Sequence, residues 1–183
     1  LNNKARALFF DRVGSLWVGH APTGISVKHN TASHFKNFVE GSGASGLTSS
    51  DILTVEVGPK SNLWVGTEEG LNYIDLKSNR VRQYRHESQD ASTLQGDPVL
   101  SVEHVGESLW VGAWSAGLSR LDIQTGNFEQ LFPQWDAKSP AFIHTDIKGH
   151  LWLGSHKGLF IITSPGTAPK KMYEQPVLSI YES

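Results

Sequence analysis

Four copies of one tetrapeptide constrain this chain more than any other feature of its sequence. Leu-Trp-Val-Gly occurs three times and Leu-Trp-Leu-Gly once. The repeated tryptophans are Trp17, Trp64, Trp110 and Trp152, spaced 47, 46 and 42 residues apart. A period of roughly 40–45 residues is typical of a four-stranded propeller blade. We therefore predict an array of similar units that buries its apolar surface by stacking neighbours.

The second repeat shows the expected strands most clearly. Short apolar runs at 52–57, 63–67, 71–75 and 80–84 are separated by clusters of turn-forming residues. This pattern predicts antiparallel all-β structure. The other repeats follow the same register, and the outer strand of the fourth is expected at 171–173. The predicted blades span residues 5–40, 51–86, 98–132 and 141–174, and residues 176–183 are expected to begin a further blade.

The repeated tryptophans are interpreted as core residues. Side chains alternate between the two faces of a strand, so Trp17 faces away from Leu16 and Val18. Both faces are then apolar, as in a sheet that lies between two neighbouring blades. A ladder of ligand-stacking rings is the alternative interpretation, but repetition at one position favours packing. The glycine after each repeated Trp-Val or Trp-Leu is expected to permit close backbone approach.

Composition narrows the range of partners. Sixteen basic and eighteen acidic side chains give a formal charge of −2, with no run of like charge. A nucleic-acid partner is not expected from such a balance. No apolar segment approaches the ~20 residues that span a bilayer, so membrane contact is expected only through other parts of a parent protein. The chain has no cysteine, which excludes disulfides and thiolate metal sites.

A family resemblance follows from the residues around the tetrapeptide. In the second repeat, Leu63–Thr67 is followed by Gly70-Leu71 and by Ile74-Asp75. This pattern resembles the two-component regulator propeller repeat. The resemblance implies a periplasmic sensor region of a bacterial signalling receptor whose output is a histidine kinase or a diguanylate cyclase. Such receptors usually have more than four blades per ring, so a partial propeller is expected here.

Catalytic patterns are absent from the sequence. It has no nucleophile elbow, no phosphate-binding glycine loop and no paired-carboxylate motif. None of its eight histidines has metal-ligand spacing, although His20 and His156 follow their tryptophans in equivalent turns. We therefore expect a non-catalytic segment without a cofactor or a metal.

The candidate binding residues lie in turns and loops. Trp114 and Trp135 are outside the repeat position, and aromatic rings on loops often form binding platforms. Local packing is the alternative for both rings. The remaining candidates occupy equivalent turns that could converge at one rim: Thr67, Glu68, Ser115, His156 and Lys157.

These observations predict a module that senses a ligand or a partner. An oligosaccharide or another small ligand would bind at the rim, with Trp114 as its first contact. Self-association through open blade faces is also expected, including the pairing of two such segments into one ring. The alternatives are a propeller enzyme of the polysaccharide lyase or hydrolase type and a plain protein-interaction scaffold.

Overall fold

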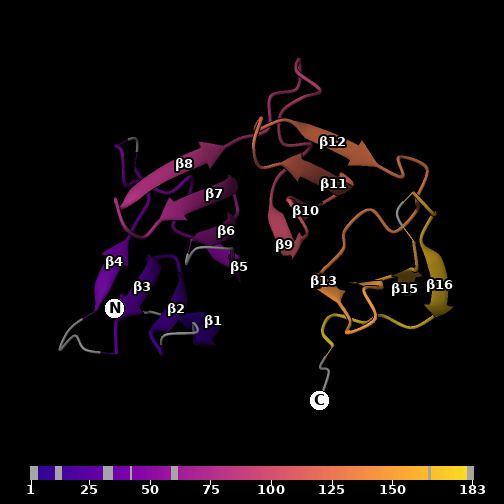
Figure 1. The fold of residues 1–183 in the computed structure, drawn as a ribbon, viewed down its shortest axis with the longest axis horizontal. Helices are drawn as coiled ribbons and strands as arrows, with labels where there is room; N and C mark the ends of the chain where they lie inside the picture. The colour runs from indigo at the N-terminus through magenta and orange to yellow at the C-terminus, as the bar shows by residue number, and fades with distance from the viewer. Residues whose placement is uncertain are drawn as a thin grey trace. The chain divides into compact units, whose positions relative to one another are not determined.

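The computed structural model describes residues 4–10, 14–30, 35–41, 43–58, 62–164 and 166–180. These residues form strands and turns without a helix, and the strands make four antiparallel four-stranded sheets (Figure 1). The predicted all-β class is confirmed, and each sheet corresponds to one repeat. In the described part of the chain, no helix is long and apolar enough to cross a bilayer.

The first two sheets, blades 1 and 2, follow the chain in simple order from inner to outer strand. Blade 1 contains β1 (Lys4–Phe10), β2 (Leu16–Ala21), β3 (Gly24–Lys28) and β4 (Lys36–Phe38). Blade 2 contains β5 (Ile52–Val57), β6 (Leu63–Thr67), β7 (Gly70–Asp75) and β8 (Arg80–Tyr84). The tetrapeptide lies on the second strand of each blade.

Blades 3 and 4 repeat this order. Blade 3 contains β9 (Val99–Val105), β10 (Ser108–Ala113), β11 (Gly117–Asp122) and β12 (Phe128–Leu131). Blade 4 contains β13 (Phe142–Thr145), β14 (Leu151–Ser155), β15 (Gly158–Ile162) and β16 (Lys170–Tyr173). The outer strand of blade 4 thus lies where the sequence predicts it. Residues 176–180 form no strand, and residues 181–183 lie outside the described residues, so the start of a further blade at 176–183 stays a prediction.

The chain divides into two compact units, which are described separately. Unit 1 spans Leu1–Arg85 and holds blades 1 and 2, and unit 2 spans His86–Ser183 and holds blades 3 and 4. In both pairs, the tryptophan-bearing face of the first blade packs against the Leu/Val face of the second. In unit 1, the face of blade 1 that carries Trp17 buries Ile25 and Val27 against Leu63 and Val65 of blade 2.

Unit 2 follows this rule with different side chains. The face of blade 3 that carries Trp110 and Leu118 packs against Leu151, Leu153 and Ile162 of blade 4. The tryptophan side of one blade therefore meets the Leu/Val side of the next in both units. This arrangement explains why both faces of each strand are apolar.

The four repeated tryptophans are mostly buried, but to different degrees. Trp17 and Trp64 are each 1% exposed, whereas Trp110 and Trp152 are partly buried. The indole N–H of Trp152 donates to Asp146 Oδ2 at 3.0 Å. This hydrogen bond is the main cause of the lowered pKa of the Asp146 carboxyl, about 2, and the backbone and side chain of His150 and the amide of Lys148 also donate to it.

The glycine that ends the tetrapeptide permits close packing against the neighbouring chain segment. A Cβ on Gly112 would lie 2.6 Å from Pro140 Cγ and 2.9 Å from the Pro140 carbonyl oxygen. A Cβ on Gly154 would overlap the ring of Phe142. A side chain cannot enter either position without moving the neighbouring segment.

A loop precedes each of blades 2, 3 and 4 and inserts one apolar side chain at an equivalent place. We call these the linker loops, and their anchors are Leu47, Leu94 and Trp135. The equivalence of two anchors follows from hydrogen bonds three residues later: Gly24 N donates to Ser50 O at 2.8 Å, and Gly117 N donates to Lys138 O at 2.9 Å. Leu47 and Leu94 are 0% exposed and Trp135 is 8% exposed. Each anchor therefore belongs to the core.

Candidate functional site

The turn rim of unit 2 brings three of the predicted site residues together. Ser115 lies in the turn between β10 and β11, and His156 and Lys157 form the turn between β14 and β15. These turns and the linker loop that precedes blade 4 enclose a hollow of about 240 Å³. Its further polar lining residues are Asp136, Lys138, Ser139 and Ser155.

Local hydrogen bonds hold the backbone of this hollow. Ser139 Oγ accepts from the backbone N–H of Ser115 at 3.1 Å, which ties the blade 3 turn to the linker loop. Ser155 Oγ accepts from the backbone N–H of Lys157 at 3.0 Å. Ser115 has a φ of 58°, in the left-handed region, so its turn is tight. Hydrogen bonds between serine hydroxyls and backbone amides therefore fix the walls of the hollow. They do not involve the long side chains at the rim.

The rim carries opposite charges within reach of each other. Lys157 Nζ lies 3.4 Å from Asp136 Oδ2, and both side chains are more than half exposed. An exposed pair of this kind contributes little to stability. Lys138 and His156 are exposed at the same rim. These exposed groups are accessible to a polar or charged ligand.

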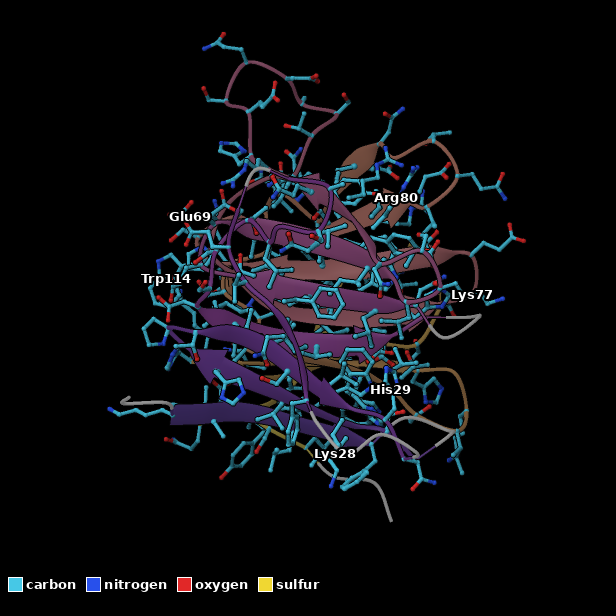
Figure 2. All side chains as sticks on the ribbon, turned by 90° about the vertical axis from the view of Figure 1, so that its left-hand side faces the viewer. Lys28, His29, Glu69, Lys77, Arg80 and Trp114 are labelled. Carbon is cyan, nitrogen blue, oxygen red and sulfur yellow. The ribbon has the colours of Figure 1, made fainter. Side chains whose placement is uncertain are left out.

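Trp114 is next to this hollow and exposes its ring. It precedes Ser115 and is 50% exposed. Figure 2 labels its side chain at the periphery of the ribbon. Its backbone N–H donates to Pro98 O at 2.9 Å. The ring is not among the side chains that line the hollow, although its neighbour Ser115 is. The sequence-based proposal of Trp114 as a platform remains a prediction.

Trp135 is packed locally, which was the alternative to a binding platform for this ring. Its ring is 8% exposed and contacts Phe160 edge-on, with the centroids 5.2 Å apart. The ring is a linker anchor packed inside unit 2. It also lines a second, more apolar hollow of about 560 Å³ with Phe132, Pro133 and Pro169. Asp136 borders both hollows.

The two remaining candidates lie in unit 1. Glu68 is exposed in the turn between β6 and β7, as expected. Thr67 is 0% exposed, and its hydroxyl is hydrogen-bonded to Thr48 Oγ1 at 2.8 Å. It also donates to Gly70 O and accepts from the backbone N–H of Glu69. The hydroxyl of Thr67 is therefore used within unit 1 and is not presented at the surface.

Sequence reasoning missed Asp136, Lys138 and Ser139. They lie in the linker loop of blade 4, where the sequence shows Trp135 and two prolines but no repeat pattern. Aligning Trp135 with the anchors Leu47 and Leu94 would have placed the next residues beside the turns. In the described part of the chain, no cluster of three histidine or carboxylate side chains could hold a metal ion.

Comparisons with known proteins support the fold. The sequence matches no protein-family profile and no curated protein. Among solved structures, it is similar to the extracellular domain of the hybrid two-component system protein BT3049 of B. thetaiotaomicron, with a TM-score of 0.81 and 17% identity over 94% of this chain and 24% of that one. The corresponding domain of BT4673 from the same organism gives a TM-score of 0.55 at 17% identity, over 97% of this chain and 32% of that one.

Enzymes share the architecture as well. Virginiamycin B lyase of Staphylococcus aureus is similar with a TM-score of 0.69 and 12% identity, over 92% of this chain and 55% of that one. The chain spans about a quarter to about half the length of these structures. At such identities the likeness establishes the β-propeller fold alone.

Proposed function

We propose that this chain is a non-catalytic sensing segment of a bacterial receptor's periplasmic propeller. The observation that carries the proposal is the hollow at the rim of unit 2, which is lined by exposed charged groups and borders the turn that carries the exposed residue Trp114. Aromatic area with a few placed polar groups is typical of small-molecule sites. The extracellular sensor domains among the similar structures support the same assignment.

The ligand class that we propose is an oligosaccharide. A sugar ring offers an apolar face for Trp114 and hydroxyls for Asp136, Lys138 and Lys157. The hollow of about 240 Å³ accommodates part of such a chain and leaves the rest over the exposed rim. Binding would change signalling only if the ligand favours one arrangement of the receptor over another.

Calorimetric titration of the chain with a panel of neutral and acidic oligosaccharides tests this proposal. For a sugar that binds, Trp114→Ala should raise Kd about 2- to 10-fold, because an aromatic contact contributes roughly 0.5–1.5 kcal/mol. Lys157→Ala should weaken the acidic members more than the neutral ones. Gln124→Ala is the matched control, because Gln124 is exposed at the opposite end of the blade 3 strands.

The same samples separate binding from catalysis. Mass spectrometry after prolonged incubation should recover each oligosaccharide unchanged. Cleavage would contradict the non-catalytic assignment and favour a lyase or hydrolase. Failure of the whole panel to bind, or equal Kd values for wild type and Trp114→Ala, would contradict the proposed rim site.

A further inference from the structure

Blade 1 has a groove on the face that bears Leu8 and Phe10. The groove measures about 460 Å³ and is lined by Val18, His20, Thr23, Ser26, Phe35, Asn37 and Val39. The apolar side chains on this face are well exposed: Leu8 68%, Phe10 67%, Phe35 47% and Val39 51%. Such an apolar face on a propeller blade indicates a contact surface.

Strand registers identify the same positions in blade 2. Val18 pairs with Ser26 across β2 and β3, as Val65 pairs with Asn72 across β6 and β7. The outer strands align in the same way, since Ile25 pairs with Phe38 and Leu71 with Tyr84. Six of the seven groove residues, all but Thr23, therefore have counterparts in blade 2. In chain order, these are Val65, Thr67, Asn72, Val81, Gln83 and Arg85.

In blade 2, this set of positions holds the linker loop that precedes the blade. The Val81 amide donates to Ala44 O at 2.8 Å. The Gln83 amide group donates to Gly41 O and Gly46 O, both at 2.9 Å. The loop is thus attached to the outer strand at Gly41, Ala44 and Gly46.

The anchor end of the loop is held by polar contacts. Thr48 N donates to Asn72 Oδ1 at 2.8 Å, and Asn72 Nδ2 donates to Thr48 Oγ1 at 2.7 Å. Thr67 shares a hydrogen bond with the same hydroxyl, and Arg85 donates to Thr48 O at 3.0 Å. Five of the six equivalent positions therefore hydrogen-bond one loop, beside the buried anchor Leu47.

Blades 3 and 4 hold their linker loops in the same place. The amide of Phe128, which corresponds to Val81, donates to Ser92 O at 2.8 Å, two residues before the anchor Leu94. In blade 4, Trp135 packs on Phe160, which corresponds to Asn72. The residues that follow the three anchors are Thr48, Gln95 and Asp136, all polar.

We propose that the groove of blade 1 is a receptor for a linker loop that leads into blade 1 from a further propeller blade. The loop would be an extended segment with an apolar anchor followed by a polar residue. Its carbonyls would accept from the Phe35 amide and the Asn37 side chain. Its polar residue would meet His20 and Ser26, which stand where Thr67 and Asn72 bind Thr48.

His20 gives independent support for a polar occupant. Its Nε2 lies 2.9 Å from Ser26 Oγ, and that hydroxyl donates to Asn37 Oδ1 at 2.7 Å. Because the hydroxyl proton is used on Asn37, the neutral tautomer that fits this contact carries its proton on Nε2 and leaves Nδ1 as an acceptor. Nδ1 is buried and has no hydrogen-bond partner among the described residues. A hydroxyl from a bound loop would satisfy it.

The chain itself supplies the means to test the proposal. Ile52 and Ala5 are equivalent, since they pair with Thr67 and His20 respectively. Leu47 lies five residues before Ile52, so a copy of residues 40–48 that replaces Leu1 puts its leucine five residues before Ala5 and its polar threonine directly after that leucine. The extended chain then offers blade 1 a loop at the natural spacing. The matched control carries aspartate in place of the added leucine.

Amide hydrogen exchange measured by NMR is the primary readout. The Phe35 amide should exchange at least 10-fold more slowly in the leucine-bearing extended chain than in the aspartate control. The thermal midpoint of the leucine-bearing extended chain should also be a few degrees higher than that of the aspartate control. Phe35→Asp in the extended chain should abolish both effects, and circular dichroism confirms that every variant is folded.

Two outcomes would overturn the proposal. Equal exchange at Phe35 with leucine and aspartate would show that the groove does not take a linker loop. A dimer of the unextended chain in sedimentation, with Phe35 already protected, would assign this face to self-association.

Discussion

Trp64 in blade 2 and Trp152 in blade 4 occupy the same strand position but are held in different ways. The ring of Trp64 is 1% exposed and lies against two tyrosines of its own blade, with centroids 4.8 Å from Tyr73 and 5.9 Å from Tyr84. Trp152 is only partly buried, and its indole N–H is bound by the Asp146 carboxylate. The repeat therefore fixes where the ring lies, while the neighbouring residues decide whether packing or hydrogen bonding retains it.

The largest expected effect is on Trp64. Trp64→Ala should lower the free energy of unfolding by about 3–5 kcal/mol, because it empties a fully buried site. Trp152→Ala should cost clearly less, since its ring keeps contact with solvent. Urea denaturation followed by circular dichroism measures both, and Trp114→Ala is the exposed control, with a change within about 0.5 kcal/mol. A loss at Trp152 equal to that at Trp64 would contradict the comparison.

The glycine of the tetrapeptide should give the next largest effect. Gly112→Ala should destabilise the chain by about 1–3 kcal/mol, because the new methyl group would press on Pro140 and Ser101. Gly43→Ala is the control, since nothing lies within 4 Å of a Cβ added there. Denaturation midpoints compare the two variants. Similar midpoints would mean that the linker before blade 4 yields easily.

The Asp146 turn predicts a pH dependence. The pKa of Asp146 is lowered to about 2, whereas an unfolded aspartate titrates near ~3.9. Between these values the unfolded chain binds more protons, so the stability that this carboxylate contributes above pH ~4 is lost as the pH falls toward 2. Asp146→Asn should make the loss of stability between pH 5 and pH 2.5 smaller. Trp152→Phe, which removes the principal donor, should act in the same direction, and an unchanged pH profile in both variants would refute the assignment.

The smallest effect is expected at the rim. Lys157→Ala should change the free energy of unfolding by no more than about 0.5 kcal/mol, because its contact with Asp136 is exposed. Thermal melts at low and high salt provide the measurement. A larger loss would show that the rim charges stabilise the fold and are less free for a ligand than proposed.

The strands of the blades could be predicted from the sequence because the pattern that specifies them repeats along the chain. Tryptophan spacing and turn clusters located the strands, including β16, where the register with the other repeats is lost. The same reasoning placed Thr67 at the rim, but the residue is the last of β6 and its hydroxyl faces inward to Thr48. A strand end and the following turn look alike in sequence, and only the hydrogen bonds separate them.

The linker loops were harder to predict because they do not repeat in sequence. Leu47, Leu94 and Trp135 are equivalent only through the hydrogen bonds around them, and the residues between each anchor and its blade differ. Trp135 therefore resembled an exposed loop ring. The rim residues Asp136, Lys138 and Ser139 were missed for the same reason, since their position depends on where the anchor enters the core.

The linker loops also bear on how such arrays can be divided or extended. Leu47 and Thr48 contact the blade that follows them, and their loop bonds to β8, which is formed more than 30 residues later. The natural module for transplantation is therefore a loop together with its downstream blade. A chimera joined just before residue 40 keeps the linker loop together with the blade that it contacts. A chimera joined at Ile52 separates the loop from that blade. Duplication of whole modules would copy each linker loop together with its blade, so every added blade would bring the loop that packs on it.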